Sequence, residues 1–333
     1  MINTELKNNI IDLYEEISEI VSTVKVVEGY LSQNYILNTS QNRYFLKQYR
    51  DSFQEEDIID VHNVIKFFVG KGVPAILPLK TKRGTSYFIF NSRIYSLFPF
   101  VEAKIGDRGN IQEKGIVSLA EALAKIHLLS FKKLPLSIKS RQGAIDRDGF
   151  LRIYPEIVRI IQSKEEKEPF DNLSLEVLEV KKSIVDKNSE KVKKLQIKRD
   201  HLLHGDYHEK NVFFDDNGEV KFIFDWEKTE IGDRFHELVR SMNFVCLDGS
   251  YEKENIDKAR LYIQTYNSLY PIEKKDFIEG LEDYYLKQAH SLWIERTHYL
   301  ENSKRVDCFL ERELAALRYF SRNYLEFADR IFV

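Results

Sequence analysis

The feature that most constrains the fold of this chain is a polar loop followed by a short hairpin, between residues 204 and 227. The loop reads HGDYHEKN, and two apolar runs follow it, VFF and VKFIF, which are joined through DDNG. Apolar runs on either side of an Asn-Gly turn are typical of a β-hairpin. This hairpin would bring Asp225 back beside Asn211, and Gly205 would allow a tight turn just before Asp206.

Three oxygen-bearing side chains in this segment suit the transfer of a phosphoryl group. Asp206 and Asn211 have four residues between them, which is the D-x-x-x-x-N interval of a kinase catalytic loop. Mg²⁺ prefers carboxylate and amide oxygens, so we expect Asn211 and Asp225 to hold this ion against nucleotide phosphates. Asp206 would orient an acceptor hydroxyl and accept its proton.

Larger motifs in the same region point to a known family. HGDYHEKNVFF, followed by FIFDWEKTEIGDRFHELVR, resembles the aminoglycoside phosphotransferase and choline kinase family, which has the protein-kinase-like fold. The resemblance combines HGDxHxxN, a hairpin, DWE and GDxxxE at that family's spacings, and weaker agreement covers residues 20–245. It implies a two-lobed α+β protein, with a small lobe of antiparallel strands around one main helix and a larger, mainly helical lobe.

The pattern of apolar residues also fits a small α+β lobe. Alternating runs within residues 23–50 predict an antiparallel meander, and residues 52–70 predict a helix that ends at Gly70 and Gly72. Two further strand-like runs follow, TSYFIFN and RIYSLFPFVEA. Strand pairing should end at Pro99 in the second run, because proline has no N–H to donate.

Beyond residue 100 the pattern becomes helical. The first such segment carries an apolar stripe at helical spacing through Ile116, Leu119, Leu123 and Ile126. A chain of 333 residues also exceeds the usual size of a single hydrophobic core. We therefore expect a nucleotide-binding lobe over residues 1–100, a hinge at about 97–103, and a catalytic and acceptor-binding lobe over residues 101–333.

The resemblance implies which residues bind the nucleotide, either ATP or GTP. Lys47 in YFLKQYR would meet the α- and β-phosphates, and the hinge would bind the adenine edge through the Pro99 carbonyl and the Val101 N–H. The polar loop EGYLSQN would cover the phosphates. Its candidate residues are Ser32, Gln33 and Asn34.

The acidic partner of Lys47 departs from the pattern of the family, in which a helix glutamate fills this role. Alignment on the GKGVP end of the helix places Val61 at that position. The acids nearby that could substitute are Asp60, Glu56 and Glu55.

Residues around the loop have supporting roles in this interpretation. His204 would hydrogen-bond behind the loop, and His208 would order the loop or lie next to a phosphate. Asp233 and Glu237 would lie near the start of a helix, where carboxylates satisfy free N–H groups. Trp226 and Glu227 are expected to pack and support Asp225 rather than react.

Composition excludes several classes of protein. The hydrophobic share is 43% and the net charge is −3, so the chain is expected to be globular and has no basic field for nucleic acid. Cys246 and Cys308 are far apart and are expected to be buried and reduced. The sequence has no secretory signal and no membrane-spanning apolar run, which favours a cytoplasmic protein. Residues 163–200 are highly charged and predict a solvated amphipathic helix with a linker.

Other functions compete with the kinase hypothesis. His201, His204 and His208 could suggest a zinc hydrolase, but Gly205 breaks the helical geometry that this spacing would need. A catalytically inactive nucleotide-binding scaffold and a protein Ser/Thr kinase are further alternatives. The sequence leaves the oligomeric state open. The acceptor could be an aminoglycoside, choline or ethanolamine, homoserine or a sugar.

Aromatic residues near the C-terminus could bind a cationic acceptor, although such residues at helical spacing more often lie in the core. The candidates are Trp293, Tyr284 and Tyr285.

Overall fold

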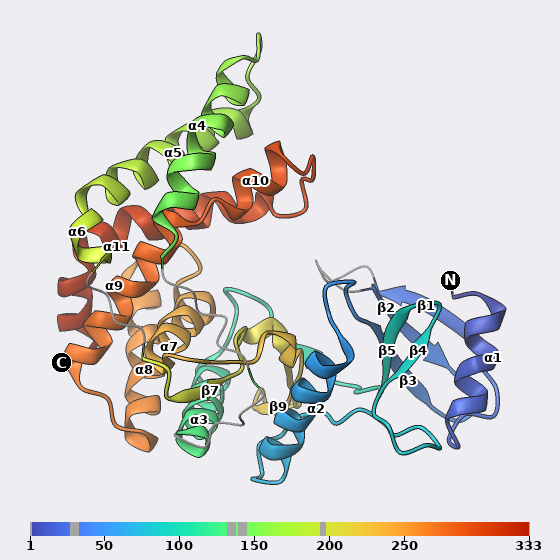
Figure 1. The fold of residues 1–333 in the computed structure, drawn as a ribbon. Helices are drawn as coiled ribbons and strands as arrows, with labels where there is room; N and C mark the ends of the chain where they lie inside the picture. Colours follow the sequence, from blue (N-terminus) through green and yellow to red (C-terminus); the bar gives the residue numbers. More distant parts are fainter. Residues whose placement is uncertain (1, 27–32, 132–137, 139–144, 194–197, 333) are drawn as a thin grey trace. The chain divides into compact units, whose positions relative to one another are not determined.

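The computed structural model describes all residues except 1, 27–32, 132–137, 139–144, 194–197 and 333. The chain divides into two compact units, of which one comprises Met1–Ile105 and Asn211–Thr229, and the other Gly106–Lys210 and Glu230–Val333. The first contains an antiparallel sheet and the second is mainly helical, which confirms the expected α+β class (Figure 1). The hairpin, within Asn211–Thr229, belongs to the first unit. The expected division at residue 100 would have assigned it to the second.

The first unit is built on a five-stranded antiparallel sheet with the strand order β1-β2-β3-β5-β4. Helix α1 packs on this sheet, where Leu6 and Ile10 join a core with Leu37, Leu46 and Leu97. The elements of this unit are α1 (Thr4–Leu13), β1 (Ser22–Val26), β2 (Gln33–Asn38), β3 (Arg43–Gln48), α2 (Glu55–Val69), β4 (Phe88–Phe90), β5 (Arg93–Pro99), β6 (Lys104–Ile105), β8 (Val212–Phe214), β9 (Val220–Ile223) and the 3₁₀ turn η2 (Trp226–Lys228).

Helix α2 and strand β5 end where the sequence predicts. A capping box formed by Gln54 and Asp57 starts α2, Gly70 caps its end, and its apolar face is buried. Strand β5 ends at Pro99. The run TSYFIFN forms a strand only over Phe88–Phe90. Val27, in the predicted meander, lies outside the described residues.

The predicted hairpin is present as β8 and β9. The two strands are antiparallel with Val212 opposite Ile223, and β6 pairs on the other edge of β8. The N–H of Ile223 donates to the carbonyl of Pro74 at 2.6 Å, which fixes the hairpin to the segment after α2. These contacts explain why the hairpin groups with the first unit.

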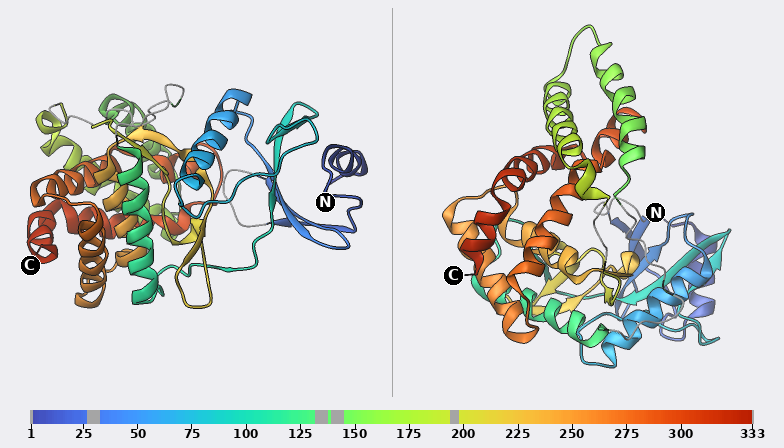
Figure 2. Two further views of the ribbon diagram at one scale, coloured as in Figure 1. Left: turned by 90° about the horizontal axis from the view of Figure 1, so that it is seen from below. Right: turned by 60° about the vertical axis from the view of Figure 1, so that its left-hand side comes forward.

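The second unit consists mainly of packed helices. Helix α3 buries the predicted stripe of Ile116, Leu119, Leu123 and Ile126, and α4 and α5 lie side by side (Figure 2). The elements are α3 (Glu113–Ser130), α4 (Arg147–Gln162), α5 (Pro169–Lys187), α6 (Ser189–Val192), β7 (His201–Leu203), the 3₁₀ turn η1 (Glu209–Asn211, which ends in the first unit), β10 (Glu230–Gly232), α7 (Arg234–Met242), the π-helix η3 (Asn243–Leu247), α8 (Lys253–Leu269), α9 (Lys274–His290), α10 (Trp293–Tyr299), the 3₁₀ turn η4 (Asp307–Phe309) and α11 (Leu310–Ile331).

Two expectations about burial were wrong. The charged segment forms α5, but Asp171 and Lys181 are buried in ion pairs rather than solvated. Cys246 is buried as expected, whereas Cys308 is exposed because it lies in the short turn η4. Within the described part of the chain, no helix has the length and apolar character needed to cross a membrane.

Candidate active site

Lys47 lies on the middle strand of the sheet in the first unit. Asn34 on β2 and Ser96 on β5 are its register partners. Its Nζ lies 2.7 Å from Asp225 Oδ1 and 2.7 Å from Glu227 Oε1. Burial by itself would lower the pKa of Lys47, but the two carboxylates outweigh it and raise the pKa, so that the amine stays charged.

Besides Asp225, Lys47 pairs with Glu227. It does not pair with Glu55, Glu56 or Asp60, the acids of α2 that the sequence suggests as its partner. Among the described residues, the ion pairs of Lys47 go to Asp225 and Glu227. On α2, Glu56 is exposed and Asp60 is partly exposed, while Glu55 accepts the hydroxyl of Tyr87 at 2.6 Å. The buried Glu227, two residues after Asp225, thus takes the place expected for a helix acid.

Asn211 and Asp225 lie at the same end of the hairpin. The carbonyl of Asn211 accepts the N–H of Phe224 at 3.0 Å. Asp225 adopts a left-handed backbone with φ of 61°, which is uncommon for a residue other than glycine. Trp226 anchors this end of the hairpin by stacking on Phe68 of α2, with 5.1 Å between ring centroids. One amide and one carboxylate oxygen are a donor set that fits a hard divalent ion.

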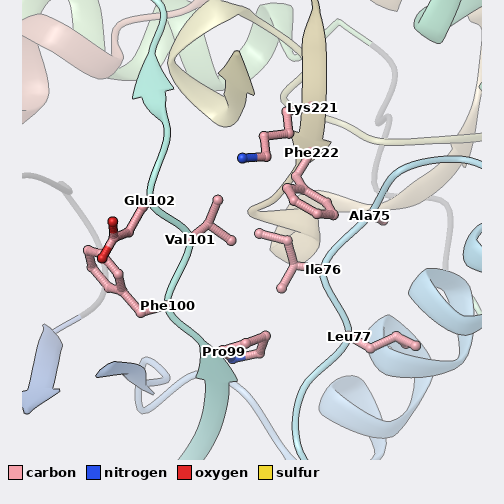
Figure 3. A pocket seen from close by; sticks show the side chains of 9 residues that line it. All are labelled: Ala75, Ile76, Leu77, Pro99, Phe100, Val101, Glu102, Lys221 and Phe222. Carbon is pink, nitrogen blue, oxygen red and sulfur yellow. The ribbon is translucent and has the colours of Figure 1, made fainter. Parts of the chain in front are cut away.

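A cavity of about 550 Å³ lies beside the segment that was expected to be the hinge. Its lining is mostly apolar, and Figure 3 shows Ile76, Val101 and Phe222 pointing toward one another across it. Pro99 lies at the end of β5 on the same wall as Val101. The volume is in the range of small-molecule pockets. An apolar pocket beside the backbone of the expected hinge suits a flat heterocycle.

The residues expected to cover the phosphates are placed only in part. Ser32 lies outside the described residues. Gln33 and Asn34 begin strand β2, where Gln33 accepts the hydroxyl of Tyr35 at 3.0 Å. Asn34 is opposite Lys47 in the sheet, so the two side chains share a face.

In the second unit, the loop that carries Asp206 leaves β7 through Gly205. Strand β7 pairs with β10, and Gly205 has φ of 83°, which a side chain would make unfavourable. Glu237 accepts the N–H groups of His204 and Gly205 at 3.2 and 2.5 Å. Glu237 therefore holds the loop rather than the start of its own helix.

The carboxylate of Asp206 faces a cation. Arg240 Nη2 lies 2.5 Å from Asp206 Oδ1, and His208 Nε2 lies 3.6 Å from the same oxygen. The N–H of Asp206 donates to His204 Nδ1 at 3.3 Å, which gives His204 a place behind the loop. The sequence does not predict the contact between Arg240 and Asp206, because one residue lies on a helix and the other on a loop that is distant in the sequence.

His208 is neutral at physiological pH. Burial, with help from Arg240 and Arg108, lowers its pKa to about 3, although Asp206 opposes the shift. Its Nδ1 accepts the N–H of Lys210 at 3.2 Å. His208 thus contacts the loop's own backbone and is not a cation that competes with Arg240.

Asp233 is the N-cap of α7. Its carboxylate accepts the N–H of Phe235 at 2.9 Å, and burial raises its pKa to about 6. Glu237 also contacts His127 Nε2 at 2.9 Å, which ties α3 to the same carboxylate.

The other candidate residues take ordinary structural positions. His201 contacts Asp200 at 2.6 Å and Tyr270 at 3.0 Å, and the described residues contain no group of three His, Cys, Asp or Glu side chains able to hold a metal. Tyr284 and Tyr285 are buried in α9, while Trp293 is 46% exposed and stacks on Phe309.

Comparisons with known proteins identify the family and the fold. Residues 23–272 match the family model of the phosphotransferase enzyme family, APH. A homoserine kinase of Parvibaculum lavamentivorans is 24% identical over 269 residues, which cover 78% of this chain and 74% of that enzyme. The spectinomycin phosphotransferase APH(9)-Ia, in complex with ADP and spectinomycin, gives a TM-score of 0.69 at 17% identity over 100% of this chain and 99% of that one. The amicoumacin kinase hAmiN, in complex with AMP-PNP, Ca²⁺ and Ami, gives a TM-score of 0.67 at 11% identity over 98% and 94% of the two chains. The structural likeness confirms the protein-kinase-like fold.

Proposed function

Because the chain belongs to the phosphotransferase enzyme family, we propose that it transfers the γ-phosphoryl group of ATP to a hydroxyl of a small molecule, with Mg²⁺ as the metal ion. The family match and the homoserine kinase relative indicate a small-molecule kinase with a hydroxyl acceptor. Relatives in complex with ADP, or with AMP-PNP and Ca²⁺, support a nucleotide co-substrate and a divalent ion.

The first unit would bind the nucleotide. The adenine edge would meet the carbonyl of Pro99 and the N–H of Val101 beside the cavity. Lys47 would leave its ion pairs in part to contact the phosphates. The ion pair between the buried Lys47 and the partly exposed Asp225 is the observation that supports the proposal, because the two side chains would act on the phosphates and on the metal ion from adjacent positions.

Asn211 and Asp225 would hold Mg²⁺, whose role is to neutralise charge on the phosphate oxygens during transfer. Asp206 would orient the acceptor hydroxyl and accept its proton. Glu237 would keep the backbone of that loop in place through the N–H groups of His204 and Gly205.

The acceptor is tested by a panel of hydroxylated compounds. Purified protein with Mg²⁺ and either ATP or GTP is assayed for ADP or GDP release in the presence of homoserine, choline, ethanolamine, aminoglycosides and sugars. Homoserine is the first compound to test, because the curated relative is a homoserine kinase. A peptide with Ser and Thr separates the small-molecule enzyme from a protein kinase.

Variants test the assigned roles. Asp206→Asn should abolish turnover and keep nucleotide binding, whereas Asp225→Asn should remove the Mg²⁺-dependent part of the thermal shift given by ATP. Asp216→Asn is the matched control, because Asp216 is an exposed carboxylate in the turn of the same hairpin. Full activity in Asp206→Asn would refute the assigned role, and a wild-type protein that gains no stability from Mg-ATP would favour a scaffold.

A further inference from the structure

Helix α7 contacts three successive residues of the loop that carries the proposed base. Glu237 accepts the N–H groups of His204 and Gly205. Arg240, three residues further along α7, donates from Nη2 to Asp206 Oδ1 at 2.5 Å. Residues three apart lie on the same face of a helix, so one face of α7 holds both the backbone of the loop and the side chain of Asp206.

The π-helix that follows α7 holds Arg240 in turn. Phe244, in η3, lies under two guanidinium groups, with its ring centroid 4.8 Å from Arg240 Cζ and 4.5 Å from Arg108 Cζ. Arg108 is itself paired with Glu209 at 2.5 Å. Stacking on an aromatic ring restricts the plane of a guanidinium, so Arg240 reaches Asp206 from a fixed direction.

We propose that Arg240 is a positioning residue, which fixes the orientation of the Asp206 carboxylate toward the acceptor hydroxyl and places a positive charge beside it. The proposal rests on the proposed function of Asp206 as the base. A charge-assisted hydrogen bond is short and directional, and a base that is misplaced by about 1 Å can lose roughly 100-fold in rate. Losing Arg240 should therefore slow the chemical step.

An arginine at this place could instead bind an anionic group of the acceptor, and kinetics separate the two roles. Loss of a positioning residue lowers kcat and leaves the KM for the acceptor nearly unchanged. Loss of a residue that binds the acceptor equally in the ground state and the transition state raises that KM and leaves kcat unchanged.

The pH profile gives a readout that a merely structural role would not move. Among the described residues, the charged and titratable groups that face Asp206 include Arg240 on α7 and His208 on its own loop, with His204 and Arg108 next to His208. Arg240 donates a charge-assisted hydrogen bond to Asp206, so its substitution removes a positive charge that lies beside the carboxylate. Without this cation the carboxylate takes up a proton at a higher pH. The acid limb of kcat/KM should then move to higher pH.

The experiment compares Arg240→Gln, Arg240→Lys and the control Arg322→Gln, which changes an exposed arginine on α11. For each full-length variant, kcat, the acceptor KM, the acid limb and the thermal shift with Mg-ATP are measured. We expect Arg240→Gln to lower kcat by about 10- to 100-fold with an upward shift of the acid limb. Arg240→Lys should recover the acid limb and part of kcat, because it keeps the charge but not the planar fork.

Each other outcome decides the question. A wild-type kcat and acid limb in Arg240→Gln would overturn the proposal, and a rise in KM alone would assign Arg240 to the acceptor. If the Gln variant does not fold, the Lys variant decides the question. A lower kcat together with the acid limb of the wild type supports the positioning role. Kinetics identical to those of the wild type refute it. A wild-type protein without any transfer activity would refute the proposed function instead, whatever the variants do.

Discussion

Lys181 on α5 lies 2.8 Å from Glu295 on α10, and neither side chain is exposed to solvent. The same Nζ lies 2.9 Å from Glu313 on α11 and donates to the carbonyl of Ser291 at 2.7 Å. Burial by itself would lower the pKa of Lys181, but the two carboxylates raise it, so the amine is charged. One lysine thus ties three helices of the second unit together.

Replacing Lys181 with Met should destabilise the fold strongly. The substitution leaves the carboxylates of Glu295 and Glu313 buried without their cation, and breaking a buried pair from one side costs about 3–5 kcal/mol. We expect a clear loss in the midpoint of thermal unfolding, measured by circular dichroism.

The matched control is Lys182→Met on the next residue of α5. Lys182 pairs with Asp186 one turn along the exposed face, and such surface pairs are worth about 0–1 kcal/mol. Equal midpoints for the two variants would show that the buried ion pairs contribute little.

Local patterns predicted the parts of this protein that depend on local physics. The apolar stripes of α2 and α3, the stop at Gly70 and the hairpin β8–β9 each follow from residues near one another in the chain. The pair of Lys181 and Glu295 could not be read in this way. Its lysine lies in a charged segment that looks solvated, and burial depends on which helices pack against it.

The candidate site shows the same division. The interval from Asp206 to Asn211 and the return of Asp225 on the hairpin are local features, so the sequence carried them. Arg240 contacts Asp206 from helix α7. The sequence predicts that helix, but it does not show which loop the helix packs against. The resemblance to the family points to an acid on α2 as the partner of Lys47, whereas the structure pairs Lys47 with Glu227, two residues beyond Asp225.

Glu227→Gln should weaken the action of Lys47 on the nucleotide. The neutral amide can still accept a hydrogen bond but no longer pairs with the ammonium, and a hydrogen bond to a charged group is worth about 1.5–3 kcal/mol. We expect roughly tenfold or greater loss in kcat/KM for ATP in steady-state kinetics.

The controls for this variant are Glu56→Gln and Asp60→Asn, which change the acids first expected to pair with Lys47. Both lie outside its ion pairs in the structure, so their kinetics should match the wild type. A greater loss of kcat/KM for ATP in either control than in Glu227→Gln would show that an acid of helix α2 is the functional partner of Lys47.

Gly205→Ala should impair catalysis more than it impairs folding. Gly205 has φ of 83°, and an L residue in the left-handed region costs about 1–2 kcal/mol. The loop would relieve this strain by moving, which displaces the adjacent Asp206, so we expect kcat to fall by about 100-fold.

Gly218→Ala is the control for backbone strain. Gly218 has φ of 80° in the hairpin turn, and an added Cβ there would meet open space. The two variants should lose similar stability in thermal unfolding, while Gly218→Ala keeps its kcat. An equal loss of kcat in both would mean that strain alone, and not the position of Asp206, explains the effect.

Asp233→Asn should change the dependence of stability on pH. Burial raises the pKa of Asp233 to about 6 from an ordinary value of 3.8. Between these two values the folded protein keeps a proton on Asp233 that the unfolded chain releases, so the contribution of this group to stability falls as pH rises through the window. Asparagine caps a helix as well as aspartate does and does not titrate.

The unfolding midpoint of Asp233→Asn, relative to the wild type, should therefore rise from pH 4 to pH 6 and stay level above it. Thermal unfolding at half-unit steps of pH measures this difference, with Asp216→Asn as the exposed control that should show no such rise. The gain is at most about 3 kcal/mol, since a shift of one pKa unit corresponds to 1.36 kcal/mol. A difference that does not vary with pH would show that Asp233 is ionised in the folded protein throughout the window, and that its bond to the N–H of Phe235 outweighs its burial.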